Sequence, residues 1–458
     1  MTANGRQLIS GWGRYPVARA VVARPDSLGD IAFPDEGSLI CRGEGRSYGD
    51  AAISSQGLVL MTSGLRRMCR FDATTGLLVA EAGVTIGDIL RAFVPHGWFP
   101  PVTPGTKHVS LGGAVAADVH GKNHHRDGSI GSHVRELELL LADGSRARCG
   151  PHDNAELFWA TVGGMGLTGM ITTVAVQLIP VETSYIVAQH FKAPDLATAF
   201  RWLEDSEHDD DYTVAWIDCL SRGQNLGRSI IIRGHHARRD ELPSRTRPDL
   251  SVTTRAPFHL FLDVPSFVVN PLSVALFNHL YYAAQGRKNR PFLVDHERFF
   301  YPLDIVDNWN RLYGKRGFLQ YQFMIPERGA EEGVRRILES LARHRRASFL
   351  AVLKRFGPGN PGPLSFPDRG YTLALDLPMT GRDVLDHLDA MDDIVLDFGG
   401  RVYLAKDARL ASARLRPMYP RLDDWLRVKY AVDPKGRFSS DLSCRLGLTT
   451  APSGQAKG

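Results

Sequence analysis

Three glycine-rich segments are the parts of this sequence whose residue types suggest chemistry. They are RGEGRSYGD at 42–50, PGTKHVSLGGAVAADVHGKNHH at 104–125 and VGGMGLTG at 162–169. Because glycine has no Cβ, backbone N–H groups in such segments can converge on an anion or on a flat ligand. The first segment is no Walker A loop, since no Gly-Lys-Ser/Thr follows, and it opens no long helix as a GxGxxG fingerprint does. One such segment could be a structural turn, but the three together favour a dinucleotide lying across loop backbones.

The second segment ends in a polar run that allows another interpretation. His120, Lys122, His124 and His125 lie close together in it, and histidines four apart on a helix can share a metal ion. Gly121 interrupts the helical pattern, however, and the run has no evident carboxylate companion. We therefore expect no metal, while a zinc hydrolase built on these histidines stays an alternative that metal content would decide.

The elements that must position these segments change in type along the chain. Short apolar runs ended by glycine fill the sequence up to Pro180, and Ala-Asp-Gly at 142–144 predicts a hairpin between two of them. Residues 83–98 predict a turn followed by a short amphipathic helix. From about residue 181, strand-like runs such as 370–378 alternate with polar helical stretches such as 328–344. This alternation indicates a sheet with helices on one face, in an α+β or α/β chain.

Composition excludes several classes of protein. The 458 residues suggest about two or three domains, and 43% hydrophobic with 23% charged residues excludes a disordered chain. A net charge of +5 without a basic block argues against a nucleic-acid partner. The five cysteines are far apart, so neither a disulfide framework nor a thiolate zinc site is expected. We also expect no secretory signal and no transmembrane helix, because no suitable apolar stretch occurs.

The glycine segments, in this order, resemble the vanillyl-alcohol-oxidase flavoproteins, which have a PCMH-type FAD-binding domain. GRSYGD, HGKNHH, FLQYQF, LSFP and AKDAR most resemble the branch that oxidises polyprenylphosphoryl ribose, and the similarity runs over 11–446. The resemblance implies an α+β fold with a two-part FAD-binding domain, at 1–182 and 400–458. It places a substrate-binding domain with an antiparallel sheet flanked by helices at 183–399, with a mobile lid at about 238–290.

The resemblance also implies FAD, and it indicates which residues hold it. Many relatives attach FAD covalently to a histidine in the first loop, where this chain has Arg46. We therefore expect non-covalent FAD, with His120 the remaining candidate for attachment and with Met170 close to the flavin. The implied cofactor contacts are Cys41, Arg42, Gly43, Glu44, Gly45, Arg46, Ser47, Tyr48, Gly49, Asp50, Ala51, Gly105, Ser110, Leu111, Gly112, Gly113, Ala117, Asp118, Val119, His120, Ile171 and Tyr403.

Lys406, in the AKDAR segment, is the residue that we expect to carry the chemistry. Oxidation of a secondary alcohol removes a hydride and the hydroxyl proton, and a lysine whose pKa is lowered by burial can accept that proton. The alternatives are that Lys406 only orients the hydroxyl, or that it is a surface lysine paired with Asp407. Gln320 and Gln322 lie on one face of a strand and could meet sugar hydroxyls. The other implied residues are His120, Lys122 and Tyr48 for catalysis, and Trp216, Asn310 and Lys354 for the substrate.

The implied activity is FAD-dependent oxidation of the C2′ hydroxyl of a polyprenylphosphoryl-β-D-ribofuranose to the 2′-keto compound. This would be the first half of epimerisation to the arabinose donor of cell-envelope glycans. The implied partners are a separate NAD(P)H-dependent short-chain reductase, quinone or oxygen as electron acceptor, and a membrane surface. The resemblance fits a cytoplasmic protein or one peripheral to the inner membrane, the periplasmic face included. The alternatives are an oxidase of a soluble alditol or aldonolactone, and a catalytically silent flavin-binding partner.

Two positions depart from the pattern of the branch. Ala374 stands where members carry a cysteine, and Thr372 stands where they carry an asparagine. Neither residue need transfer a proton, so the reaction can survive. Cysteine-directed inhibitors should not bond covalently here, and the identity of the lipid chain is left open.

An apolar stretch at 257–280 is the candidate contact with lipid. Prolines and polar residues interrupt it, so it cannot span a membrane. The basic residues beside it are Arg245, Arg247, Arg255, Arg287, Lys288 and Arg290. Such flanking charges suit anionic headgroups and a lipid tail, and the alternative is an ordinary long loop. We hypothesise a flexible lid over the sugar site that lets a polyprenyl tail stay in the bilayer.

Overall fold

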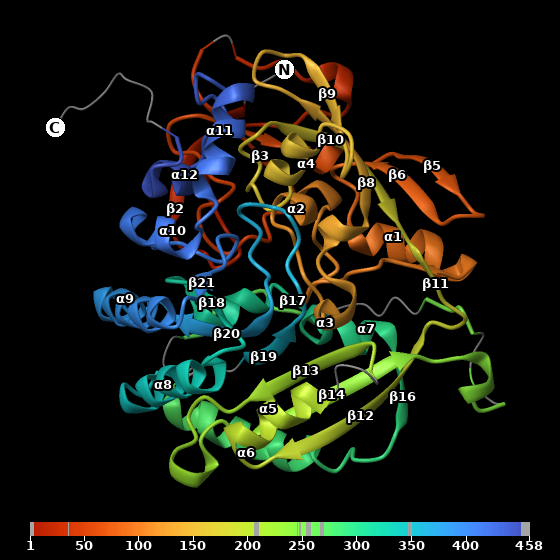
Figure 1. The fold of residues 1–458 in the computed structure, drawn as a ribbon, viewed down its shortest axis with the longest axis vertical. Helices are drawn as coiled ribbons and strands as arrows, with labels where there is room; N and C mark the ends of the chain where they lie inside the picture. The colour runs from red at the N-terminus through yellow and green to blue at the C-terminus, as the bar shows by residue number, and fades with distance from the viewer. Residues whose placement is uncertain are drawn as a thin grey trace.

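The chain forms two halves that differ in architecture. In the computed structural model, the N-terminal sheets and the C-terminal helices lie together in the upper half of Figure 1, and the middle of the chain forms the lower half. The structure describes residues 4–34, 36–205, 210–244, 246, 249–252, 258–265, 270–346, 348 and 350–449. One hydrophobic core of buried side chains runs through both halves, so the chain is α+β as predicted.

The upper half contains two sheets. The first has the order β1-β2-β4-β3, and its inner pairs β2–β4 and β3–β4 are parallel. The second is antiparallel, with the order β5-β6-β10-β8-β9, and the predicted hairpin joins β8 to β9. A short ladder pairs β7 with β11. The strands are β1 (Asn4–Ser10), β2 (Val17–Ala23), β3 (Leu39–Arg42), β4 (Leu58–Met61), β5 (Met68–Asp72), β6 (Leu77–Glu81), β7 (Trp98–Phe99), β8 (Val134–Leu140), β9 (Arg146–Cys149), β10 (Met170–Gln177) and β11 (Ile179–Pro180).

The lower half contains one antiparallel sheet of eight strands, in the order β16-β12-β14-β13-β19-β20-β18-β21. Strand β18, between β20 and the short edge strand β21, carries the sequence FLQYQFMIP and is buried almost throughout. A two-residue parallel ladder joins β15 to β17 beside it. The strands are β12 (Tyr185–Ala193), β13 (Tyr212–Ile217), β14 (Ser229–His236), β15 (Phe258–His259), β16 (Phe292–Asp295), β17 (Val306–Asp307), β18 (Phe318–Pro326), β19 (Ala351–Phe356), β20 (Gly370–Pro378) and β21 (Arg401–Val402).

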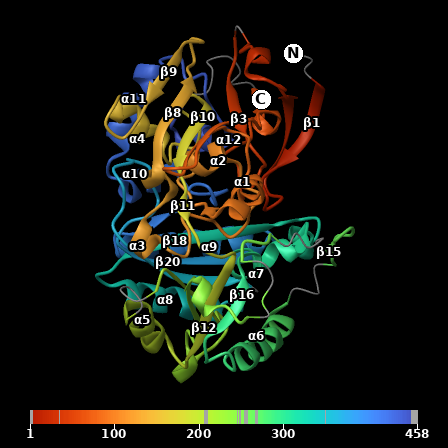
Figure 2. The ribbon, with the colours of Figure 1, turned by 90° about the vertical axis from the view of Figure 1, so that its right-hand side faces the viewer.

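Amphipathic helices cover one face of this sheet. In α8 the buried Val334, Ile337, Leu338 and Leu341 follow the 3.6-residue period and face the core. Figure 2 shows α5, α8 and α9 on the same side of the sheet. The helices are α1 (Ile86–Phe93), α2 (Leu111–Ala116), α3 (His124–Asp127), α4 (Ala155–Thr161), α5 (Leu196–Asp205), α6 (Pro271–Gln285), α7 (His296–Phe300), α8 (Ala330–Arg343), α9 (Arg382–Asp397), α10 (Ser412–Met418), α11 (Leu422–Val432) and α12 (Asp441–Leu446).

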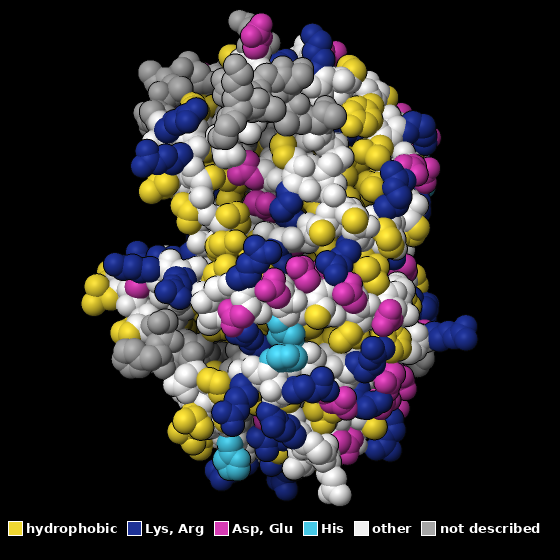
Figure 3. All heavy atoms as spheres, turned by 90° about the vertical axis from the view of Figure 1, so that its left-hand side faces the viewer, with side chains coloured by type: hydrophobic (Ala, Val, Ile, Leu, Met, Phe, Trp, Pro, Cys, Tyr) yellow, Lys and Arg dark blue, Asp and Glu magenta, His cyan; other side chains and the backbone are white. Residues whose placement is uncertain are grey.

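The outer surface of α8 and α9 is charged but of mixed sign. Figure 3 shows dark blue and magenta side chains interspersed over this side of the molecule. Many of them form ion pairs, such as Arg335 with Glu332 and Glu339, and Arg336 with Asp397. This side of the molecule therefore presents no broad field of one sign.

The other face of the sheet is shared between the upper half and helix α6. Trp216, Val352, Ala374 and Gln322 form one row across four neighbouring strands, and side chains in such a row point to one face. Trp216 lies at one end of the row and packs on Tyr281 of α6, with ring centroids 4.8 Å apart. The three other residues of the row line the cavity beneath the upper half.

Helix α6 forms where a loop was expected. We took Pro271 as an interruption, but proline at the first helical position matches the helix geometry, and Asn270 caps the N–H groups of Leu272 and Ser273. The expected lid at 238–290 therefore contains a helix, with strand β16 following it. Arg245, Arg247, Arg255 and Pro257 lie outside the described residues. In the described part of the chain, no helix is long and apolar enough to cross a membrane.

A buried ion network fastens the C-terminal segment to the first glycine segment. Arg445 in α12 pairs with Asp50 at 2.8 Å and with Asp407 at 2.9 Å. Both carboxylates are nearly inaccessible to solvent. Asp407 follows Lys406 directly, so the network also fixes the loop that carries this lysine.

Replacing Arg445 with methionine should lower the free energy of unfolding by about 3–5 kcal/mol, because Asp50 and Asp407 would stay buried without their cation. Urea unfolding followed by circular dichroism measures this change. The control is Arg427→Met, because the pair of Arg427 with Glu156 is exposed on both sides and its loss should leave the midpoint unchanged. Equal shifts in the two variants would contradict a special role for the network.

Candidate active site

One cavity lies between the two halves, and the glycine segments and strands β18 to β20 line it. It receives most of the residues that the sequence singled out. The predicted residues in its lining are Cys41, Gly43, Glu44, Gly45, Arg46, Ser47, Tyr48, Ala51, Gly105, Ser110, Gly112, Gly113, Ala117, Val119, His120, Ile171, Gln320, Gln322, Lys354, Tyr403 and Lys406. Segments far apart in the sequence therefore meet here, as expected for a cofactor next to a substrate.

The first glycine segment presents free backbone donors to this cavity. The N–H groups of residues 43–47 make no hydrogen bond to any residue that the structure describes. Gly45 has a left-handed φ of 64°, and such a turn of consecutive N–H groups forms a cradle for anions. At Gly105, a Cβ would meet no atom within 4 Å, so the backbone there is bare. These features fit an extended anionic ligand such as the pyrophosphate of a dinucleotide.

Close packing of the loops shapes the same wall. A Cβ at Gly43 would lie 2.0 Å from Oγ of Ser110, so any larger residue would force the two loops apart. The hydroxyl of Ser110 also accepts the N–H of Gly113 at the start of α2. The first and second glycine segments can thus pack this closely only because residue 43 has no side chain.

The opposite end of the cavity is polar and contains two amines. Burial lowers the pKa of Lys406 to about 7, although Asp376 opposes the change. Burial also lowers the pKa of Lys354 to about 7, and the charges of Lys122 and Lys406 add to this effect. Both amines can therefore exist in the uncharged form near neutral pH, which a proton acceptor requires.

A hydrogen-bond chain with a definite direction ends at Lys354. The hydroxyl of Thr372 donates to the carbonyl oxygen of Phe323 at 2.8 Å, so its oxygen must accept from Gln322 Nε2 at 3.2 Å. This contact fixes the orientation of the amide. The same Nε2 then donates to Nε2 of His120 at 3.0 Å, so the proton of the imidazole sits on Nδ1.

The proton on Nδ1 of His120 determines the protonation state of the Lys354 amine. Nδ1 of His120 lies 2.9 Å from Nζ of Lys354, and its N–H can be accepted only by an uncharged amine. Burial is the main cause that holds the pKa of His120 well below its ordinary value, which agrees with a neutral ring. The chain of Thr372, Gln322, His120 and Lys354 is therefore consistent throughout with a neutral amine at Lys354.

Lys406 lies in a separate group beside this chain. Its Nζ is 3.9 Å from the centre of the Tyr48 ring. Gln320 donates to Oδ1 of Asp376 at 2.6 Å, while Oδ2 of the same carboxyl is buried without a partner among the described residues. Burial raises the pKa of Asp376 to about 7. Lys406 therefore has a weakly acidic neighbour instead of a full counter-ion, which keeps its amine available.

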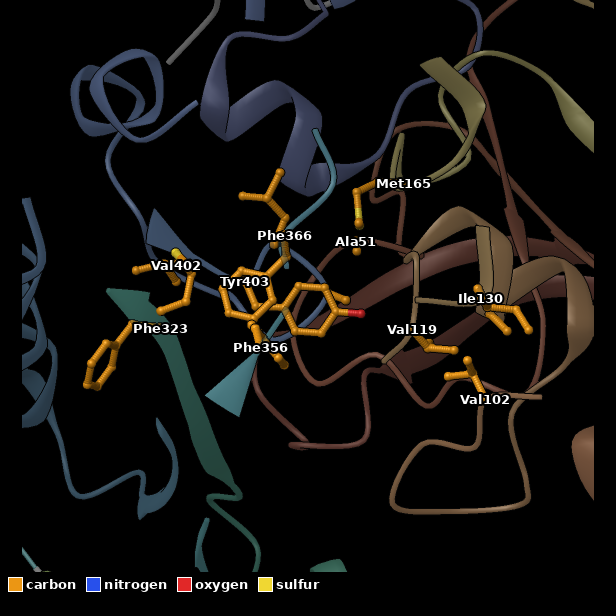
Figure 4. Packing of buried hydrophobic residues seen from close by; sticks show 14 of the residues in the cluster. Ala51, Val102, Val119, Ile130, Met165, Phe323, Phe356, Phe366, Val402 and Tyr403 are labelled. Carbon is orange, nitrogen blue, oxygen red and sulfur yellow. The ribbon is translucent and has the colours of Figure 1, made fainter. Parts of the chain in front are cut away.

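Aromatic rings support this polar end from behind. Tyr403 stacks on Phe366 with centroids 4.5 Å apart, and the ring of Phe356 lies 4.7 Å from that of His120. Figure 4 shows Phe356, Phe366 and Tyr403 packed together on the side away from Ile130. The hydroxyl of Tyr403 donates to the carbonyl of Ala117 at 2.6 Å, which ties this cluster to the second glycine segment.

Several predicted residues lie outside the cavity lining, and the structure gives most of them another task. Asp118 accepts hydrogen bonds from Ser129, Gly131, Asn360 and Ser365, and it thereby joins two loops. Lys122 donates to the carbonyl of Phe299 and acts on Lys354 only through its charge. The others outside the lining are Arg42, Gly49, Asp50, Leu111, Trp216 and Asn310. Their roles in the site stay predictions.

Other cavity residues were not predicted. Met165 and Gly166 were not named as contacts, although they belong to the third glycine segment, which was expected to contribute to a dinucleotide site; their φ angles are left-handed, at 53° and 75°. Nζ of Lys429 donates a hydrogen bond of 2.6 Å to the carbonyl oxygen of Leu167 and so stabilises the third glycine segment. Trp12, Leu303 and Trp309 also line the cavity, and no local sequence pattern indicates this, because only the tertiary fold brings them there.

The histidines of the second segment do not converge. His125 hydrogen-bonds the carbonyl of Asp210 at 3.0 Å, whereas His124 packs on Phe356. In the described part of the chain, no group of three or more His, Cys, Asp or Glu side chains could hold a metal ion.

Comparison with known proteins shows the family of the chain. A family model described as FAD binding domain matches residues 34–150, and one described as D-arabinono-1,4-lactone oxidase matches residues 369–446. The chain is 40% identical over 451 residues to the decaprenylphosphoryl-β-D-ribose oxidase of Mycolicibacterium smegmatis, covering 96% of this chain and 97% of the relative. The chain belongs to the decaprenylphosphoryl-β-D-ribose oxidase family.

Other relatives are more distant. An uncharacterized protein of Streptomyces coelicolor is 36% identical over 373 residues, which is 80% of this chain and 100% of the relative. The mouse L-gulonolactone oxidase is 23% identical over 449 residues, with 93% and 95% covered. Membership of the decaprenylphosphoryl-β-D-ribose oxidase family makes the chain an FAD-dependent oxidoreductase that acts on a CH–OH group. The cradle of free N–H groups at residues 43–47 fits that cofactor.

Replacing Thr372 with valine should raise the pKa of Lys354 from about 7 toward its ordinary value. Without the hydroxyl, the Gln322 amide can turn so that its Oε1 accepts a hydrogen bond from Nε2–H of His120. Nδ1 of the ring is then free to accept a hydrogen bond from the ammonium group of Lys354. A pH titration of the protein labelled with ¹³C at lysine Cε measures the midpoint, and the signal lost in Lys354→Met identifies the residue. Thr372→Ser keeps the hydroxyl and should keep the wild-type midpoint. A valine variant with an unchanged midpoint would contradict the directed chain.

Proposed function

We propose that this chain oxidises the C2′ hydroxyl of a polyprenylphosphoryl-β-D-ribofuranose to the 2′-keto compound. The similarity to the M. smegmatis oxidase over nearly the whole chain carries the proposal, and the amine of Lys406 at the polar end of the cavity supports it. In this role the enzyme supplies the first half of a ribose-to-arabinose epimerisation for cell-envelope glycans.

The residues of the polar end divide the work. FAD, when bound, accepts the hydride. Lys406 takes the hydroxyl proton on Nζ, because its lowered pKa leaves much of the amine uncharged near pH 7. The amide hydrogens of Gln322 are used by Thr372 and His120, so only Oε1 is left to accept a hydrogen bond from a sugar hydroxyl. FAD is held without a covalent bond, since Arg46 replaces the histidine of the first loop.

The two halves divide the tasks in the same way. Residues 1–182 with 400–458 form the FAD-binding domain, and residues 183–399 form the substrate domain. The joining of the C-terminal segment to Asp50 supports this division. Strand β21 at Arg401–Val402 pairs with β18 as the edge strand of the eight-stranded sheet. It therefore lies at the boundary between the two proposed domains.

The purified protein should show a flavin absorption band that bleaches anaerobically when a short-chain polyprenylphosphoryl ribose is added. Acid precipitation should release the flavin. Lys406→Met should slow the bleaching by about 10²- to 10⁴-fold, whereas Lys435→Met on the surface should not change it. The wild-type rate should rise with pH and level off above about 7, because only the uncharged amine of Lys406 accepts a proton.

An oxidase of soluble alditols or aldonolactones is the second candidate, favoured by the lactone-oxidase model over residues 369–446. Bleaching by a free alditol or lactone, with none by the phosphoryl ribose, would establish it instead. Mass spectrometry of the product should find two hydrogens fewer than in the substrate. An accumulated ketone would agree with a separate NAD(P)H-dependent short-chain reductase as the next enzyme, and reoxidation by quinone or by oxygen would identify the electron acceptor.

A membrane surface is the proposed docking partner, through the outer face of α6. Leu272, Leu276 and Leu280 are spaced four apart and are 83%, 62% and 58% exposed, so they form an apolar stripe that faces outward. Phe258, Phe261 and Leu262 are also exposed, in and just after strand β15, which pairs with β17. Arg287, Lys288 and Arg290 follow the helix and are exposed, which suits anionic headgroups at the inner membrane.

The protein should sediment with vesicles that contain anionic lipid. Leu272→Ser combined with Leu276→Ser should weaken this binding at least about tenfold, because each leucine contributes burial of apolar area. The control is Leu8→Ser combined with Val17→Ser, which removes equally exposed apolar residues from strands β1 and β2. Equal weakening in both double variants would show that α6 is not the docking face.

A further inference from the structure

The side chain of Arg46 is a half-buried cation that makes no close ion pair with a carboxylate in the described part of the chain. Its guanidinium stacks on the ring of Trp12, 4.0 Å from the ring centre. Its Nε is buried and has no hydrogen-bond partner among the described residues. Asp304, Glu44 and Asp307 act on it electrostatically, but no described carboxylate lies within ion-pair distance. A permanent charge held in this way favours binding of an anion.

The other cations of the cavity do not serve as anion sites. Of the described residues that line the cavity, Arg46, Lys354 and Lys406 carry basic side chains. Lys354 contacts Nδ1 of His120 at 2.9 Å, and burial lowers its pKa to about 7, so its amine does not carry a full charge near neutral pH. Lys406 must be uncharged to accept a proton. Arg46 is therefore the residue that offers a fixed positive charge.

Arg46 shares the cavity lining with Lys406 of the polar end and with the apolar residues Trp12, Leu303 and Trp309. It precedes Tyr48, whose ring carries Lys406, by two residues. Arg46 stacks on Trp12, which packs edge-on against Trp309 with centroids 5.8 Å apart, and Trp309 and Leu303 also line the cavity. Next to them, Ile305 and Leu312 are 54% and 38% exposed. The order is sugar pocket, cation, apolar surface.

We propose that the Arg46 guanidinium binds the phosphodiester group of the substrate, while the backbone N–H groups of the same loop face the cofactor. This inference rests on the proposed function. A sugar–phosphate–lipid molecule has its groups in the same order as the pocket, the cation and the apolar surface. A guanidinium can hold two phosphate oxygens at once, and stacking on Trp12 orients its plane. One loop thereby serves two anions, with its backbone and with a side chain.

The test compares a short-chain phosphoryl riboside with an uncharged alkyl riboside of the same chain length, using the flavin-loaded enzyme. Arg46→Gln should raise KM for the phosphoryl compound about 10- to 100-fold with kcat nearly unchanged, and should leave both constants for the uncharged riboside as they are. Arg46→Lys should restore part of the affinity. Arg382→Gln, at the exposed start of α9, should behave as wild type.

A binding measurement without turnover separates the two proposals. Isothermal titration with a short-chain alkyl phosphate should detect binding to wild type and its loss in Arg46→Gln, at an unchanged ratio of flavin to protein. Loss of flavin without a selective loss of the alkyl phosphate would overturn the inference and assign the side chain to the cofactor. Equal losses for charged and uncharged ribosides would overturn it as well. If the wild type bound the alkyl phosphate through Arg46 but did not oxidise the riboside, the proposed function would fail and the anion site would stand.

Discussion

The site depends on keeping amines uncharged inside a cavity. A buried ammonium group is costly to desolvate, so burial alone lowers the pKa of Lys354 and Lys406 to about 7. At Lys354, the fixed donor and acceptor roles in its hydrogen-bond chain add to the effect of burial. Because the Thr372 proton is used by a backbone carbonyl, each later partner in the chain has one allowed role, and the last one is an acceptor at Lys354.

The fold makes this arrangement rigid. The donors and acceptors lie on β18 and β20, adjacent strands of one sheet, and His120 arrives from the upper half. The two halves are joined by a continuous core and by the network of Arg445 with Asp50 and Asp407. The loop of Lys406 is therefore fixed from both sides, and its amine keeps its distance from Tyr48 without a counter-ion of its own.

The first glycine segment shows how one loop serves two purposes. Gly43 packs closely against Ser110, and residues 43–47 line the cavity with N–H groups that bond no described residue. Its one long cationic side chain, Arg46, leaves the loop toward Trp12. Backbone and side chain of a single residue can thus face different ligands, which the order of residues in the sequence does not reveal.

The sequence by itself predicted the fold class, because glycine spacing and strand alternation are local properties that can be recognised along the chain. Its resemblance to a flavoprotein family indicated the residues, such as Lys406 and His120, that the structure brings into one cavity. The sequence did not determine that 271–285 forms a helix with an outward apolar stripe, since proline reads as a breaker until its place at the helix start is known. Only the tertiary structure decided which of the predicted residues share the cavity, which of them, like Asp118, brace loops instead, and which way the chain from Thr372 to Lys354 is directed. The reason is physical. Hydrogen-bond direction and desolvation depend on neighbours that are distant in sequence, such as Phe323 and His120, and these meet only when the sheet and the upper half close on each other.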